Sequence, residues 1–262
     1  MFWDRINRTK QKMERGEPSL GFFVCTPEPT LIEIMGMTGF DYAAFDMEHG
    51  RLGIRDIENL VRVCDAVGLT PFVRIPYGDF NIALRCLESG AQGIVMSHTC
   101  RGEDVRRLVQ CCRYAPQGRR GFAVNTRTSD YGINDPKAYI RSANQNILVA
   151  AMVEDVEGVD NLDAILGENG LDLVFIGPGD LSNDMGHVCE FSHPEVLKTM
   201  DNIVQRTLRA GKQMAMFASE WEVARRYMQA GVRMIAYMSE VDLFARACKE
   251  TVSNFRKISA EV

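Results

Sequence analysis

The strongest constraint on the fold of this chain is a regular alternation of short apolar runs with longer amphipathic segments. Short apolar runs predict buried strands, whereas apolar positions spaced three or four residues apart predict helices that bury one face. The predicted strands cover residues 20–25, 41–48, 70–76, 93–97, 147–153, 171–177, 213–217 and 233–237, and the predicted helices cover 30–38, 54–67, 80–89, 102–113, 159–166, 194–210 and 241–258.

Eight strand–helix units in 262 residues have the size and rhythm of a (β/α)8 barrel, also called a TIM barrel. We therefore predict a single α/β barrel domain over residues 1–262. A doubly wound open sheet is the alternative. It is disfavoured because no glycine-rich dinucleotide fingerprint follows the first predicted strand.

Helix boundaries are marked by recognisable end signals. Ser192 and Ser219 are each followed three residues later by glutamate, the spacing of a capping box at a helix start. Glycines follow five predicted helical runs, where a left-handed C-cap favours glycine: Gly39, Gly68, Gly90, Gly211 and Gly231.

Composition narrows the functional class. The net charge is −5 and the sequence has no long basic cluster, so we expect no nucleic-acid partner. No apolar run is long enough to cross a bilayer, and the charged N-terminal segment has no signal-peptide core, so we expect no membrane partner and a cytoplasmic location. None of the eight cysteines forms a C-x-x-C pair, which favours reduced thiols over disulfides or a zinc site.

Reactive side chains follow several predicted strands at the end where barrel enzymes place their active sites. Asp46, Glu48 and His49 follow the second strand, Arg74 ends the third, and Glu154 ends the fifth. Gly177-Pro-Gly-Asp180 follows the sixth. A solvated rim would also be polar, so each residue has an ordinary structural interpretation beside the catalytic one.

Glu154 and Asp180 are expected to be neighbours because they follow consecutive strands. Considered alone, Glu154 is a strand terminus in water and Asp180 is a turn residue. Together, two close carboxylates repel unless a cation lies between them, and magnesium or manganese suits an all-oxygen site. Arg74 could make a salt bridge. Held rigidly at a strand end, it could instead bind a carboxylate or enolate through both nitrogens.

His49 is one of four histidines and could be an exposed loop residue. Beside Asp46 it could also be a general base whose tautomer the carboxylate fixes, while we expect Glu48 to support the rim. The small residues at 177–179 allow backbone N–H groups to approach an anion, although they also suit a simple turn. The loop over 115–136 is long and is expected to contribute to specificity.

Six motifs follow one another along nearly the whole chain: Gly39-Phe-Asp-Tyr, Asp46-Met-Glu-His-Gly50, Val73-Arg-Ile-Pro76, Arg113-Tyr-Ala-Pro-Gln-Gly-Arg-Arg-Gly121, Val153-Glu154 and Phe175-Ile-Gly-Pro-Gly-Asp-Leu-Ser182. In this order they resemble the HpcH/HpaI aldolase family of metal-dependent (class II) pyruvate aldolases, typified by 4-hydroxy-2-oxoheptanedioate and 2-dehydro-3-deoxyglucarate aldolases.

The resemblance implies a barrel of the phosphoenolpyruvate/pyruvate superfamily. It also implies a homo-oligomer, a hexamer or trimer of dimers, that exchanges the C-terminal helix at about 241–258 between subunits. Glu154 and Asp180 would bind a divalent metal, with Mg²⁺ or Mn²⁺ expected first and Co²⁺ as a further candidate.

The resemblance also assigns roles around the metal. Arg74 would hold the carbonyl or enolate oxygen of the 2-oxo acid. His49, supported by Asp46, would belong to the acid–base apparatus. The backbone at Gly179 and Asp180 would receive the substrate carboxylate.

Three positions depart from the family pattern. Met152 replaces a glutamine near the metal-bound substrate. Glu88 replaces an aspartate that normally reaches a neighbouring subunit's site, which affects the expected handling of the aldehyde. Ser97 replaces a proline, and this substitution is expected to let His98 face the mouth as an additional acid–base group.

The predicted function is reversible cleavage of a 4-hydroxy-2-oxo acid to pyruvate and an aldehyde, through a metal-stabilised enolate. A Schiff-base mechanism is rejected because no lysine lies at a predicted strand end. One alternative is a Claisen-type lyase or synthase acting on an acyl-CoA and a 2-oxo acid, like a citrate synthase or malyl-CoA lyase. The other is a barrel that binds a 2-oxo acid without turning it over.

Overall fold

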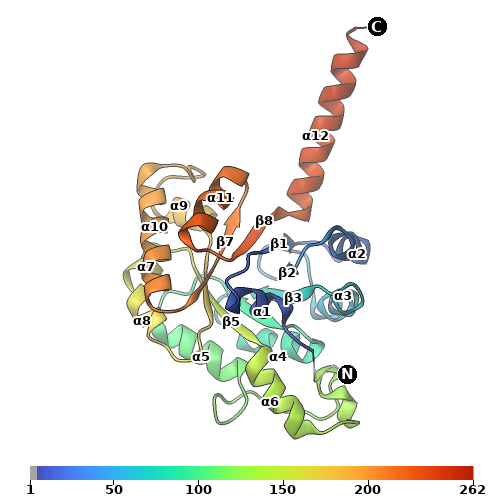
Figure 1. The fold of residues 1–262 in the computed structure, drawn as a ribbon, viewed down its shortest axis with the longest axis vertical. Helices are drawn as coiled ribbons and strands as arrows, with labels where there is room; N and C mark the ends of the chain where they lie inside the picture. The colour runs from blue at the N-terminus through green and yellow to red at the C-terminus, as the bar shows by residue number, and fades with distance from the viewer. Residues whose placement is uncertain (1–4, 262) are drawn as a thin grey trace.

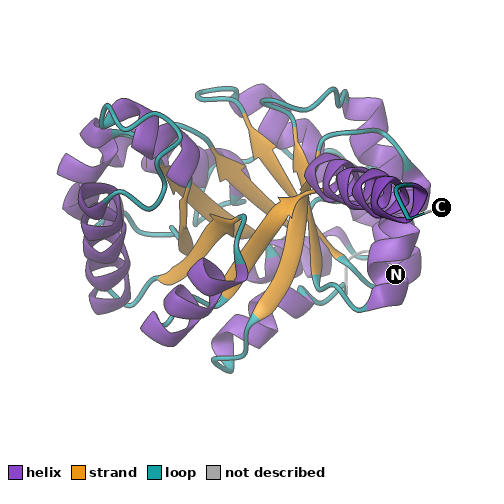
Figure 2. Ribbon diagram, turned by 90° about the horizontal axis from the view of Figure 1, so that it is seen from above, coloured by secondary structure: helices purple, strands orange, loops and turns teal. Residues whose placement is uncertain are grey.

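The computed structural model describes residues 5–261, so the outermost residues of the predicted 1–262 domain, including the start of the charged N-terminal segment, lie outside the described residues. Within this range eight parallel strands pair in chain order, and β1 pairs with β8 to close a barrel. Figures 1 and 2 show the helices surrounding the strands. The predicted (β/α)8 barrel is confirmed, and the doubly wound alternative is wrong.

The observed elements match the predicted order closely. The strands are β1 (Ser19–Val24), β2 (Tyr42–Asp46), β3 (Thr70–Ile75), β4 (Gly93–Met96), β5 (Leu148–Val153), β6 (Leu173–Ile176), β7 (Gln213–Ala218) and β8 (Met234–Ser239). The helices are α1 (Arg8–Glu14), α2 (Pro29–Thr38), α3 (Ile54–Val67), α4 (Phe80–Ser89), α5 (Gly102–Cys112), η2 (Arg127–Gly132), α6 (Pro136–Asn146), α7 (Val156–Asp160), α8 (Leu162–Leu166), α9 (Pro178–Asp184), α10 (Pro194–Arg209), α11 (Trp221–Ala230) and α12 (Glu240–Ser259).

Alternation along each strand divides its side chains between the barrel interior and the helices. Tyr42, Ala44, Phe72, Met152 and Phe175 belong to the interior cluster, which Met13 of α1 also joins. The interior is a packed core rather than a pore, as expected for a barrel of this size. The same alternation points the residue two positions further along into the mouth, as Asp46 follows Ala44, Arg74 follows Phe72 and Glu154 follows Met152.

The outer core lies between the strands and the helices. In α3 the buried residues Ile57, Leu60, Val61 and Cys64 recur at helical spacing. At one point the packing requires glycine, because a Cβ on Gly93 would lie only 2.2 Å from the Phe72 ring. These contacts fix the strands and therefore the positions of the side chains at their ends.

Several boundaries differ from the predictions. The capping-box prediction is wrong at both sites, because the N-caps of α10 and α11 are His193 and Glu220 rather than the serines before them. The predicted helix 159–166 is two short helices, α7 and α8, that meet at Asn161. All five predicted C-terminal glycines do have positive φ.

Sequence reasoning missed α1, α6 and α9. The predicted loop over 115–136 also contains η2 and ends at the first residue of α6. Arg120, within this loop, and Arg113, just before it, are buried, and Arg120 donates a hydrogen bond to the hydroxyl of Tyr139 on α6. The loop is therefore anchored to the barrel by buried polar contacts.

The last helix, α12, leaves the barrel instead of packing against it (Figure 1). Its start is fixed because Glu240 Oε1 accepts hydrogen bonds from the backbone of Cys25 and Thr26. Beyond this anchor Phe244 and Phe255 are 73% and 69% exposed. An apolar side of this size normally lies against another protein surface.

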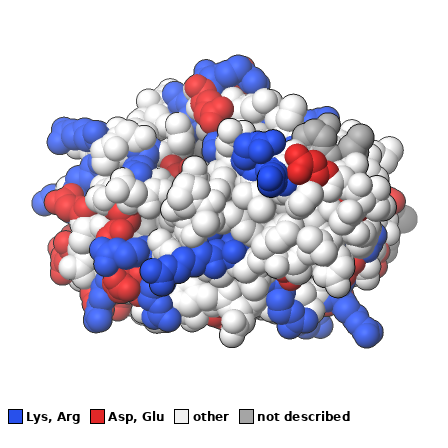
Figure 3. Space-filling view, turned by 90° about the horizontal axis from the view of Figure 1, so that it is seen from below, with Lys and Arg blue, Asp and Glu red and all other residues white. Residues whose placement is uncertain are grey.

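No helix in the described range is long and apolar enough to cross a membrane. Viewed from below, basic and acidic side chains form small groups around a broad uncharged area (Figure 3). The cysteines, which the sequence predicted to be reduced, are free thiols in the structure. Cys64, Cys86 and Cys112 are buried, whereas Cys248 on α12 is exposed.

Candidate active site at the barrel mouth

A pocket of about 240 Å³ opens at the C-terminal ends of the strands. This is the end at which barrel enzymes carry out their chemistry. It is lined by Phe23, Cys25, Asp46, His49, Arg74, Met152, Glu154, Phe175, Gly177, Pro178, Gly179, Asp180, Phe191, Phe217, Ser239 and Asp242. Every predicted site residue except Glu88 therefore lines one pocket.

Asp46 and Arg74 form the most firmly held pair in this pocket. They are direct partners in the register of β2 and β3, so alternation brings both side chains to the mouth. Arg74 donates from Nε to Oδ1 at 2.9 Å and from Nη2 to Oδ2 at 2.5 Å. Its guanidinium also lies 4.7 Å from the centre of the Phe23 ring. Asp46 and Phe23 therefore hold the arginine in place.

The electrostatics agree with this geometry. Burial would raise the pKa of Asp46, but its hydrogen bonds from Arg74 and the arginine's charge bring the pKa below its usual value. Burial opposes the charge on Arg74 as well, yet Asp46 raises its pKa. Both groups stay ionised, and Arg74 presents a permanent positive charge to the pocket.

His49 lines the pocket, but it is not oriented as predicted. Its side chain is 60% exposed, and its Nε2 lies 3.9 Å from Glu48 Oε2. The hydrogen bond from His49 to Asp46 uses the backbone N–H. The expected fixing of the His49 tautomer by Asp46 is therefore wrong, because the Asp46 oxygens receive Arg74 and backbone N–H groups.

Glu154 is only 1% exposed. Its Oε1 accepts the backbone N–H of His98 at 2.9 Å, while Oε2 makes no hydrogen bond within the described chain. Gly177 leaves room for this oxygen, because a Cβ there would lie 2.2 Å from it. Burial raises the pKa of Glu154 to about 7, although His98 and Arg74 act in the opposite direction.

Asp180 lies in the first turn of α9 and lines the same pocket. Its charge contributes to the raised pKa of Glu154, so the two carboxylates interact. An unpartnered buried carboxylate oxygen beside a second carboxylate is the donor set of a hard divalent cation. The residues present therefore fit the predicted metal.

A second polar group lies beside Glu154. The His98 ring has Nδ1 3.1 Å from the Asp155 carboxylate and Nε2 3.6 Å from Glu48 Oε1. Burial lowers the pKa of His98, but the charges of Glu154, Asp155 and Glu48 outweigh this and raise it overall. His98 is surrounded by these three carboxylates, but it is not among the residues that line the mouth pocket, so its predicted acid–base role there stays a prediction.

The remaining predicted residues separate into two groups. Met152 is buried, with its sulfur 3.9 Å from Arg74 Nη1, and Gly179 has open space where a Cβ would lie. Glu88, in contrast, is on α4 and lines a different pocket with Arg55 and Arg85. Within one chain it lies outside the mouth pocket.

Sequence reasoning missed Phe191, Phe217 and Asp242 as pocket residues. Phe217 is at a position of β7 whose side chain points into the barrel, and this alternation could have identified it. The loop residue Phe191 has no such signal.

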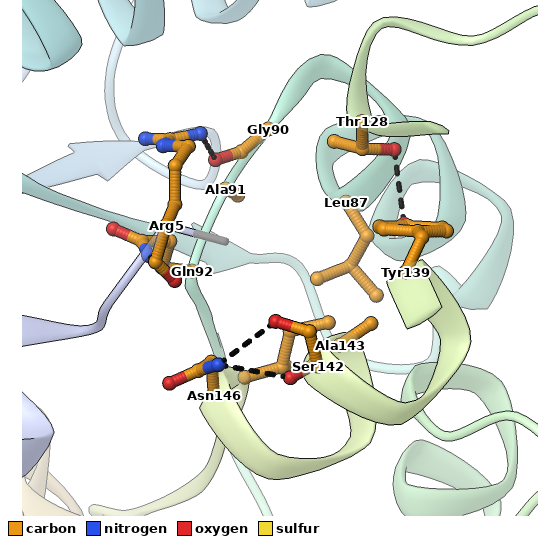
Figure 4. Close-up of a pocket in the computed structure, with 11 residues that line it drawn as sticks. Arg5, Leu87, Gly90, Ala91, Gln92, Thr128, Tyr139, Ser142, Ala143 and Asn146 are labelled. Atoms are coloured by element: carbon orange, nitrogen blue, oxygen red, sulfur yellow. Dashed lines mark hydrogen bonds between the residues drawn. The ribbon is translucent and has the colours of Figure 1, made fainter. Parts of the chain in front are cut away.

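Figure 4 shows another cavity, of about 40 Å³, where Arg5 donates a hydrogen bond to the carbonyl of Gly90. It lies where β4 and β5 begin, so it is at the opposite end from the mouth.

The fold and this pocket define an α/β-barrel enzyme with an acidic rim and one fixed arginine. A family model described as HpcH/HpaI aldolase/citrate lyase matches residues 19–247, and the chain belongs to this family. It is a carbon–carbon lyase of the aldolase class, as the sequence predicted.

Full-length relatives support this assignment. The chain is 30% identical to the 5-keto-4-deoxy-D-glucarate aldolase of Escherichia coli O157:H7, covering 96% of this chain and 97% of the relative. It is 32% identical to the hydroxypyruvate/pyruvate aldolase of Deinococcus radiodurans, covering 97% and 92%. The interpretation as a barrel without catalysis is therefore set aside.

Solved structures agree. An HpcH/HpaI family protein from Burkholderia cenocepacia superposes with a TM-score of 0.89 at 29% identity, covering 95% of this chain and 99% of that one. A citrate synthase superposes with a TM-score of 0.87 at 26% identity, covering 95% and 98%. The same barrel is therefore shared by a protein described as an HpcH/HpaI aldolase/citrate lyase family member and by one described as a citrate synthase.

Proposed function

We propose that this chain is a divalent-metal-dependent aldolase that reversibly cleaves a 4-hydroxy-2-oxo acid to pyruvate and an aldehyde in the cytoplasm. The observation that carries the proposal is the unpartnered Oε2 of Glu154, buried in one pocket with Asp180 and Arg74. A carboxylate left without a partner at this depth is costly unless a ligand completes it. The aldolase names of the relatives support the reaction class.

Glu154 and Asp180 would hold the cation, with Mg²⁺ or Mn²⁺ expected first and Co²⁺ also compatible. When bound, the cation supplies Lewis-acid stabilisation of negative charge on the substrate oxygens. The chain's own residues bind and orient the substrate and move its proton.

Arg74 would stabilise the negative charge that develops on the 2-oxo oxygen when the carbon–carbon bond breaks. It suits this role because Asp46 and Phe23 hold it in place before substrate binds, so little reorganisation is required. Asp46 therefore acts as a positioning residue for Arg74.

The substrate carboxylate would bind at the start of α9. The backbone N–H groups of Gly179 and Asp180 lie in the first helical turn, where N–H groups have no intrahelical partner. The open space over Gly179 allows an anion to approach the backbone closely. This placement directs the 2-oxo group toward Glu154 and Arg74.

His49 would accept the 4-hydroxyl proton during cleavage and return it during synthesis. Its imidazole lines the pocket and is largely exposed, so it can exchange its proton with solvent. Phe23, Phe175 and Met152 cover the inner wall with apolar surface. This surface strengthens the electrostatic contacts at the reacting atoms by excluding water.

We also propose that the working form is a homo-oligomer, a hexamer or trimer of dimers, in which α12 is exchanged between copies. The exposed apolar side of α12 supports this, as do Ile34 and Met37 on α2, which are 51% and 84% exposed. In such an assembly Glu88 would contribute to aldehyde handling in a neighbouring subunit.

The direct test follows the exchange of pyruvate methyl protons for deuterium by NMR, with Mg²⁺, Mn²⁺ or a chelator. We expect exchange that depends on metal and is lost in Glu154→Ala and Asp180→Asn. Exchange that survives in both variants would refute the assigned metal site. Exchange that no metal supports would refute the pyruvate donor.

A Claisen condensation is the second candidate, favoured by the superposition on a citrate synthase. It would use the same metal and arginine but would consume an acyl-CoA. Consumption of acetyl-CoA in the presence of oxaloacetate, without pyruvate proton exchange, would select this function over aldol cleavage.

A further inference from the structure

We propose that Glu48, His98 and Glu154 form a second cation site, which has a nitrogen ligand and shares Glu154 with the Glu154–Asp180 pair. The occupant would be a first-row transition-metal cation. The inference rests on the proposed function only in taking Glu154 to be a metal ligand. Asp180 does not belong to this three-residue group.

The geometry already brings the ligand atoms together. One oxygen or nitrogen from each of the three residues lies within 4.8 Å of the other two. The ring of His98 approaches Glu48 Oε1 through Nε2 at 3.6 Å, while its backbone N–H holds Glu154 Oε1 at 2.9 Å. Small side-chain movements would bring the three residues to ligand distances.

Two of the three residues carry an oxygen that lacks a hydrogen bond among the described residues. These are Glu48 Oε2 and Glu154 Oε2. Glu48 Oε2 lies 3.5 Å from Arg74 Nη1, but Asp46 already holds that guanidinium through its other nitrogens. Buried carboxylate oxygens of this kind are normally satisfied, so a missing ligand is the direct explanation.

His98 is oriented for metal binding by Asp155. Both carboxylate oxygens of Asp155 lie 3.1 Å from Nδ1, an arrangement that favours a proton on Nδ1, so Nε2 is the nitrogen available to a cation near Glu48. A carboxylate that fixes the tautomer of a ligating histidine is the usual outer shell of a metal–histidine bond. Without a cation, the same Asp155 adds a third acidic group around one imidazole.

The backbone also holds the ring in position. His98 has φ of 48°, a left-handed conformation that is uncommon for residues other than glycine. The turn is held on both sides, because the Ser97 hydroxyl donates to the carbonyl of Ile75 and the Thr99 N–H donates to that of Met152. Strain kept at a site by such contacts is typical of a functional position.

The ligand chemistry predicts a metal preference. Magnesium favours oxygen donors and retains its waters, whereas imidazole suits transition metals such as iron, nickel, copper and zinc. The Glu154–Asp180 pair offers oxygen alone, but the Glu48–His98–Glu154 group adds a nitrogen. Transition metals should therefore bind in a way that magnesium does not reproduce.

Pulsed EPR of Mn²⁺ added to the full-length, chelator-stripped protein tests the proposal. We expect modulation from a directly bound ¹⁴N nucleus, replaced by a ¹⁵N signal after labelling with ¹⁵N-histidine. The nitrogen signal should be lost in His98→Gln and kept in Asp180→Asn. His49→Gln and His193→Gln are matched controls that should keep the nitrogen signal. The first removes the imidazole near Glu48, and the second removes one from the separate group formed by His187, Glu190 and His193.

Absence of a nitrogen signal in the unmodified protein would overturn the proposal. So would its survival in His98→Gln, or its loss in Asp180→Asn. The ¹⁵N-histidine measurement needs no substitution, so it holds even if His98→Gln does not fold. Mg²⁺-dependent proton exchange in pyruvate tests the proposed function separately. A missing nitrogen signal with normal exchange would refute only the second site, and a nitrogen signal without exchange would refute only the proposed function.

Discussion

Replacing Glu154 with glutamine should remove a pH-dependent loss of stability that the buried carboxylate imposes on the metal-free protein. The pKa of Glu154 rises from an ordinary 4.5 to about 7 in the folded chain. Between these values the folded state binds more protons than the unfolded state. Folding stability must therefore fall as the pH rises from about 4.5 through 7.

The magnitude follows from the shift. Each pKa unit corresponds to about 1.4 kcal/mol, so full ionisation of Glu154 costs about 3 kcal/mol above pH 7. About 2 kcal/mol of this should appear between roughly pH 5.5 and pH 8. Glutamine cannot ionise, so the variant should lack this part of the pH dependence. Any cost of an unpaired amide would not vary with pH.

The assay is urea unfolding at fixed protein concentration with a chelator, at several pH values, for the unmodified chain and Glu154→Gln. Fixed concentration matters because assembly contributes to apparent stability. The free energies of unfolding should diverge in favour of the variant as the pH rises. Added Mn²⁺ should stabilise only the unmodified chain. Parallel pH profiles for the two proteins would refute the reasoning.

Three further outcomes are expected. Arg74→Lys keeps the charge but loses the two-point contact with Asp46, so the pyruvate exchange rate should fall about 100-fold with the fold intact by circular dichroism. Metal affinity measured by calorimetry should weaken about tenfold per pH unit below roughly 7, because Glu154 must lose its proton to bind. Phe244→Ser with Phe255→Ser should shift sedimentation toward smaller species, whereas Lys249→Ala should not.

The fold was predictable because its signals are local and repeated. Buried parallel strands are continuous apolar runs, and α3 and α4 show helical spacing with a glycine at the end, so their bounds matched the prediction. The missed helices lack this pattern. The helix α9 is seven residues long and begins within Gly177-Pro-Gly179, a sequence that suggests a turn. Likewise, the N-cap positions of α10 and α11 depend on backbone geometry that spacing alone does not specify.

The sequence predicted which residues form the site but not which of their side chains contact each other. Asp46, Arg74 and Glu154 lie at or just beyond the carboxyl ends of their strands, at positions whose side chains point inward. This predicts that they meet at the barrel mouth, and in the structure they line one pocket. Which carboxylate meets which base depends on register and rotamer. Sequence proximity suggested Asp46 with His49, whereas the direct pairing of β2 with β3 joins Asp46 to Arg74.

The mouth contains two kinds of charge with different energetic roles. Asp46 and Arg74 satisfy each other, so that side is rigid and stays ionised without a ligand. Glu48 and Glu154 retain oxygens without hydrogen bonds within residues 5–261, and they face an imidazole oriented by Asp155. A group that destabilises the fold persists only where a ligand offsets its cost. This contrast separates the positioning half of the site from its binding half. His98, which follows the departing Ser97, lies in the binding half, where its imidazole would bias the proposed site toward transition metals.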